Sequence, residues 1–105
     1  MVFFHKYQIM ADVLITCDVE LEPITPEPRY RVYVDQELFA ERRWIWPDQY
    51  LEENIWLRAS PGCYTVRIEL VGADQAWLHV NNYQICSGPA RINQAGQMEI
   101  LDENM

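Results

Sequence analysis

The stretch ASPGCYTVRIELVGADQAWLHVNN, residues 59–82, decides the fold of this chain. Within it, residues 64–70 alternate between apolar and polar side chains, which is the period of two of a strand with one buried face. Residues 72–75, GADQ, have the composition of a chain reversal, and residues 76–81 begin a second alternating run. The stretch therefore predicts a β-hairpin of two antiparallel strands.

Similar alternation continues on both sides of this stretch. Strands are predicted at residues 13–21, 29–34, 38–43, 50–59, 83–86, 90–92 and 98–101. Turn-forming residues separate several of them, at Asp35-Gln36, at Asn81-Asn82, at residues 87–89 and at residues 93–96. Three prolines within residues 23–28 predict a loop or a crossover between sheets, because proline cannot donate to a sheet ladder.

No segment carries a helical stripe, and seven to nine short strands separated by turns are typical of a sandwich. We therefore expect an all-β fold, a two-sheet antiparallel β-sandwich of jelly-roll or Greek-key-like topology, with an open barrel as the nearest competitor. A chain of 105 residues has room for one such domain. Residues 11–105 are assigned to it, and residues 1–10 to an N-terminal extended arm or edge strand.

Charge, apolar runs and cysteines bear on three questions: binding to nucleic acid, contact with a membrane and the redox state of the compartment. Eight basic residues scattered among sixteen acidic ones give a net charge of -8, which argues against a nucleic-acid surface. No run approaches the roughly 20 apolar residues of a membrane helix, so no membrane contact is expected. Cys17, Cys63 and Cys86 fit neither a disulfide framework nor a zinc ribbon, and Cys17 falls on the inward parity of its strand. A reducing compartment is expected.

The sequence lacks a recognisable catalytic motif, and we expect no enzyme activity, no cofactor and no metal site. Glu52 and Glu53 are adjacent, so on a strand they face opposite sides and cannot act as a carboxylate pair. Asp18, Glu20 and Glu22 share one face, where a solvated acidic surface is favoured over a cation site. His79 fits an exposed strand position as well as a site residue.

Two apolar segments are candidate interfaces with a partner protein. The N-terminal arm is more apolar than a free tail, and the segment from Arg42 to Trp46 combines arginine with tryptophan, as interface centres do. Two alternatives stay open for the second segment: its rings close one end of the core, or they form a platform for a sugar. The candidate interface residues are Phe3, Phe4, Tyr7, Arg42, Arg43, Trp44 and Trp46.

The strings VYVDQEL, ASPGCYTVRIELVG and AWLHVNNYQI, within Tyr30 to Ile85, resemble the second half of galactose-binding-like and carbohydrate-binding-module sandwiches. Gln36 stands where that pattern has glycine. The resemblance implies a carbohydrate-binding module as the alternative function. Its implied ligand-binding residues are Trp44, Trp46, Trp77, Asn81 and Asn82.

A second resemblance is carried by Arg31 to Leu38, Glu41 to Pro47, Tyr50 to Glu53 and the PGCYTVRIELVG string. These are similar to small β-rich accessory proteins in virions of tailed phages, including T4-like phages of cyanobacteria. The resemblance implies a non-enzymatic virion structural protein, such as a capsid decoration protein, assembled in the host cytoplasm. The implied partners are other virion proteins, a major capsid or tail protein, within a homo- or hetero-oligomeric assembly.

Overall fold

The computed structural model describes residues 10–23, 29–43, 50–71 and 76–102, and these form eight β-strands. The strands predicted at residues 29–34, 50–59 and 90–92 have the predicted bounds, and the others differ at their ends or are merged. The eight are β1 (Ala11–Pro23), β2 (Arg29–Val34), β3 (Glu37–Arg43), β4 (Tyr50–Ala59), β5 (Gly62–Val71), β6 (Ala76–Ser87), β7 (Ala90–Ile92) and β8 (Gln97–Ile100).

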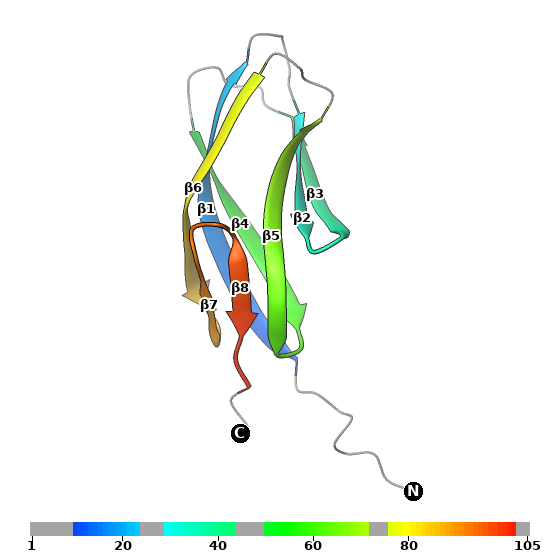
Figure 1. Cartoon of the computed structure of the whole chain (residues 1–105), viewed down its shortest axis with the longest axis vertical. Coiled ribbons are helices and arrows are strands. Elements are labelled where there is room, and N and C mark those ends of the chain that lie inside the picture. Colours follow the sequence, from blue (N-terminus) through cyan, green and yellow to red (C-terminus); the bar gives the residue numbers. More distant parts are fainter. Residues whose placement is uncertain (1–9, 24–28, 44–49, 72–75, 103–105) are drawn as a thin grey trace, which may run out of the picture.

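The strands form two sheets that pack face to face (Figure 1). The three-stranded sheet has the order β4-β1-β6, and the five-stranded sheet has the order β3-β2-β5-β8-β7. Every strand pairing is antiparallel. The predicted all-β, two-sheet antiparallel sandwich is confirmed.

The core lies between the sheets and is built from alternate residues of the strands. On β1 the inward parity is buried from Val13 to Leu21, because this strand is the centre of its sheet and packs against the five-stranded sheet. Its buried side chains are Val13, Ile15, Cys17, Val19 and Leu21. The prediction that Cys17 is a small buried side chain is therefore confirmed.

The predicted hairpin across residues 59–82 is wrong. β5 pairs with β2 and β8 in the five-stranded sheet, whereas β6 pairs with β1 in the three-stranded sheet. The chain therefore passes from one sheet to the other between these two strands. A period of two followed by a turn-rich segment fits either a reversal within a sheet or a crossing between sheets, and the pattern alone does not separate them.

The predicted turn at Asn81-Asn82 is also wrong, because β6 continues through it as a β-bulge. The register against β1 shifts there, and Asn82 adopts a positive φ of 58°. The extra residue changes which positions of β6 face the core. Even-numbered Val80 faces it before the bulge, and odd-numbered Tyr83 faces it after the bulge. Asparagine tolerates the left-handed conformation, which bulges and turns both require, and this explains why the sequence resembled a turn.

The turn at Asp35-Gln36 is confirmed as a two-residue connection, since Val34 pairs directly with Glu37. Asp35 takes the positive φ of 54°, so no glycine is needed at the second turn position. Its backbone nitrogen donates to the Thr65 carbonyl at 2.8 Å, and its Oδ1 accepts from the Thr65 nitrogen at 2.8 Å. These two bonds attach the turn to β5.

Candidate interaction surfaces

The two edge strands on one side of the sandwich, β3 and β4, are tied together by an ionic cluster. Glu53 of β4 is 2 % exposed, on the inward parity that the apolar residues of this strand share. It accepts a hydrogen bond of 2.5 Å from Tyr30 Oη, and the Arg42 guanidinium donates to both of its oxygens, at 2.9 Å and 3.2 Å. Arg42 is thereby held against the protein itself.

The same side of the sandwich also carries a groove, which we call the edge groove. It has a volume of about 410 Å³ and lies between the β2–β3 hairpin and the end of β4. Its apolar lining includes Met10, Leu38 and Phe39, with exposed fractions of 51 %, 54 % and 40 %. Asp35 and Glu37 add two carboxylates to its lining.

A third feature, the Trp56 face, lies on the outer side of the three-stranded sheet. The Trp56 side chain is 60 % exposed, and its cross-strand neighbour on β1 is the half-buried Leu14. Asn54 and Arg58 share its parity on β4 and are exposed. The Arg58 guanidinium makes two hydrogen bonds to the Asp12 carboxylate, at 2.8 Å and 3.1 Å. An exposed indole is thus flanked by an amide and a fixed ion pair.

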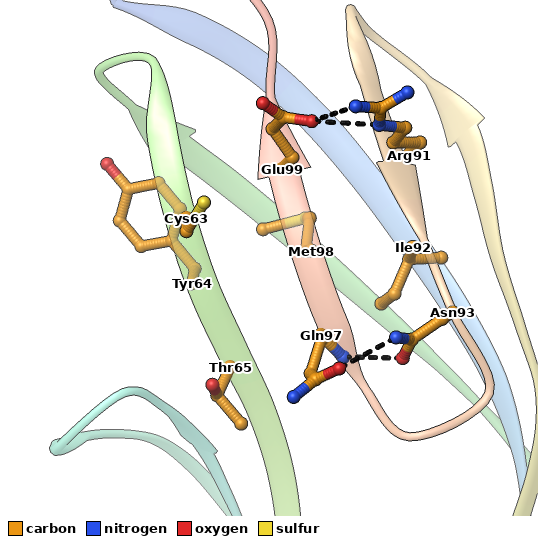
Figure 2. A pocket seen from close by; sticks show the side chains of 9 residues that line it. All are labelled: Cys63, Tyr64, Thr65, Arg91, Ile92, Asn93, Gln97, Met98 and Glu99. Carbon is orange, nitrogen blue, oxygen red and sulfur yellow. Dashed lines mark hydrogen bonds and ion pairs between the residues drawn. The ribbon is translucent and has the colours of Figure 1, made fainter.

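Strands β5, β8 and β7 carry a hollow with a volume of about 500 Å³ (Figure 2). Polar side chains of β7, of Asn93 that follows it and of β8 are bonded to each other across it. Arg91 pairs with Glu99 at 2.5 Å, and Asn93 Nδ2 donates to Gln97 Oε1 at 2.8 Å. The exposed Cys63 lies on the β5 side. Four polar side chains of the lining are therefore bonded within the hollow itself.

The electrostatic environment of the titratable groups is set by these contacts. Burial, with Glu53, Asp18 and Glu52 nearby, raises the pKa of the Cys17 thiol to about 12. The Arg58 guanidinium lowers the pKa of Asp12, and Arg31 does the same to Glu41, which lies 2.7 Å away. Burial and the hydrogen bond to Glu53 raise the pKa of Tyr30 far above its ordinary value.

Several predicted site residues lie outside the described residues, namely Phe3, Phe4, Tyr7, Trp44 and Trp46. Trp77 belongs to β6, but its side chain is not among those described. Of the rest, Arg43 is exposed at the end of β3, and Asn82 Nδ2 donates to Asp18 Oδ2 at 2.8 Å. The Oδ1 atom of Asn81 is buried, and none of the described residues donates a hydrogen bond to it. The interface and ligand-binding roles of all these residues stay predictions.

The predicted separation of Glu52 and Glu53 is confirmed, with Glu52 exposed and Glu53 buried. Sequence reasoning did not single out Leu38, Phe39 or Trp56. A signal existed for Trp56, because it alternates with Ile55 and Leu57 and so falls on the outward parity.

Within the described ranges, no group of three or more His, Cys, Asp or Glu residues is arranged to hold a metal ion. The same ranges contain no helix of the length and apolar character needed to cross a bilayer. Comparisons of the chain with protein-family models, with curated proteins and with solved structures found no match.

Proposed function

We propose that this chain is a non-enzymatic structural protein that acts through protein–protein contacts made at the edge groove, contacts between copies of the chain among them. The observation that carries the proposal is the gathering of exposed apolar side chains there. Met10, Leu38 and Phe39 all line this one groove, between the edge strands of the two sheets. Large exposed apolar surfaces mark contact sites, and edge strands are the natural place for another chain to add.

The charge distribution offers no cluster of cations for an anionic ligand among the described residues. Six of their arginines form ion pairs with carboxylates of the same chain. They are Arg29, Arg31, Arg42, Arg58, Arg67 and Arg91. A virion of a tailed phage, with a capsid or tail protein as the partner, is the setting that the sequence resemblance implies, and it rests on that resemblance alone.

The proposal is tested by the association of the purified full-length chain, measured by sedimentation velocity over a range of concentrations. Wild-type protein should associate, and Leu38→Asp should weaken association by about tenfold or more, as the loss of an interface anchor does. Leu101→Asp is the matched control, because Leu101 is 41 % exposed and is not part of the groove lining. A wild-type chain that remains monomeric, or equal losses in both variants, would contradict the proposal.

A carbohydrate-binding module is the second candidate, and the Trp56 face is the observation that favours it. An exposed indole can stack on a sugar ring, while the Asn54 amide and the Arg58–Asp12 pair can bond hydroxyl groups. Titration with soluble oligosaccharides should then change the tryptophan fluorescence in a saturable way. The change should disappear in Trp56→Ala and persist in Leu38→Asp. Absence of any saturable change in the wild-type protein would eliminate this candidate.

A further inference from the structure

We propose that the occupant of the edge groove is the N-terminal segment, residues 1–9, of a second copy of this chain. This inference rests on the proposed function and names its partner. The edge groove has apolar lining, and a segment of the same chain matches its chemistry.

The groove requires an apolar segment that also carries positive charge. Leu38 and Phe39 supply apolar surface, and Asp35 and Glu37 supply negative charge. The positive charge of Arg58 is already committed to Asp12. The Glu37 carboxylate takes part in none of the side-chain hydrogen bonds or ion pairs found among the described residues. A cation brought by the occupant would therefore complete the groove.

The sequence of residues 1–9, MVFFHKYQI, has this chemistry. Phe3, Phe4 and Tyr7 are large apolar anchors, and Lys6 is the only lysine of an otherwise acidic chain. Nine extended residues reach about 30 Å, which exceeds the length of a strand of seven residues such as β3. The segment is long enough to lie along the whole edge.

The geometry of the chain favours a second copy over the same copy. Met10 itself lines the groove and continues directly into β1, so a segment that filled its own groove would have to reverse within a few residues. Residues 5–10, HKYQIM, contain no glycine, proline, asparagine or aspartate, the residues that reversals favour. The composition of the segment therefore favours insertion into a neighbouring molecule, as in exchange of an identical element between copies.

The test is a complementation experiment with two full-length variants. Phe3→Asp/Tyr7→Asp alters the segment and keeps the groove, whereas Phe39→Asp alters the groove and keeps the segment. Each variant alone should associate at least about tenfold more weakly than wild type. An equimolar mixture should recover association, because the intact segment of one variant meets the intact groove of the other. Leu101→Asp in place of Phe39→Asp is the control and should associate without a complementing partner.

Three results would overturn the inference. The first is undiminished association of Phe3→Asp/Tyr7→Asp while Phe39→Asp loses it, which leaves the groove as a contact site with another occupant. The second is a melting temperature of the monomeric segment variant far below that of the wild-type chain measured as a monomer. That result would place the segment against its own chain. The third is failure of the mixture to associate although both variants melt as the wild type does. Loss of association in neither variant would instead contradict the proposed function itself.

Discussion

Tyr30 Oη lies 2.5 Å from Glu53 Oε1 and so joins the two sheets through the core by a hydrogen bond to a buried carboxylate. Tyr30 belongs to β2 of the five-stranded sheet and Glu53 to β4 of the three-stranded sheet. Arg42 completes the cluster from the solvent side. A buried carboxylate is tolerated only when its charge and its lone pairs are satisfied, and here both conditions depend on residues of the other sheet.

The first prediction concerns the removal of either partner of Glu53. Tyr30→Phe should lower the free energy of unfolding by about 1 to 3 kcal/mol, because the buried Glu53 Oε1 loses one of its two donors and keeps only Arg42 Nε. Arg42→Met should cost about 2 to 3 kcal/mol, less than a fully buried pair because the arginine is partly exposed. Urea unfolding measures both. Arg43→Met is the control for Arg42→Met and should change stability by less than about 0.5 kcal/mol.

Two neighbouring residues on β4 provide a test of which face of this strand points to the core. Ile55 is fully buried, whereas Trp56 is 60 % exposed. Ile55→Ala should therefore cost about 2 to 5 kcal/mol, and Trp56→Ala no more than about 1 kcal/mol, although it removes far more atoms. Thermal or urea unfolding of the two variants decides the matter. If Trp56→Ala were the more destabilising, the faces of β4 would be assigned the wrong way round.

The three cysteines should differ in reactivity. Cys17 is buried and its pKa is raised to about 12, so its thiol is both inaccessible and protonated at neutral pH. Cys63 and Cys86 are exposed. A disulfide reagent such as Ellman's reagent should modify two thiols in the folded protein, and the third only after denaturation. Cys17→Ala should leave the native count at two, and a native count of three in the wild type would show that the core around β1 opens readily.

Much of this fold can be predicted from local pattern alone. The strands at residues 29–34 and 50–59 follow from alternation of apolar and polar residues, and the buried face of β1 follows from the same rule. What local pattern lacks is the pairing. The partner of β5 is set by packing across the sandwich, so a strong alternating strand followed by a turn was predicted to pair with the next strand and does not.

The candidate surfaces, like the strand pairing, could be predicted only in part from local sequence pattern. Trp56 lies on the outward parity of its strand and could have been identified from the sequence. The edge groove could not, because Met10, Leu38 and Leu57 come from separate segments that only the packing of the two sheets brings together. Glu53 falls on an inward parity, but its partners Tyr30 and Arg42 are more than ten positions away and on other strands. A charged residue at an inward position predicts that a buried partner exists, but the sequence does not identify which residue that partner is.

The last prediction is the pH dependence of the Asp12–Arg58 pair, which borders the Trp56 face. The folded pKa of Asp12 is lowered by the hydrogen bonds to Arg58, so the pair stabilises the folded chain fully at pH values above the ordinary Asp pKa of about 4. This stabilisation is lost as the pH falls through the lowered pKa, where Asp12 becomes protonated in the folded state. Arg58→Gln should therefore reduce stability at neutral pH by a small amount, since both groups are exposed, and the difference from wild type should vanish in acid. Unfolding by urea at a series of pH values measures the difference. In an Asp12→Asn background, Arg58→Gln should have the same effect at every pH, and a pH-dependent difference that survives there would assign the titration to another group.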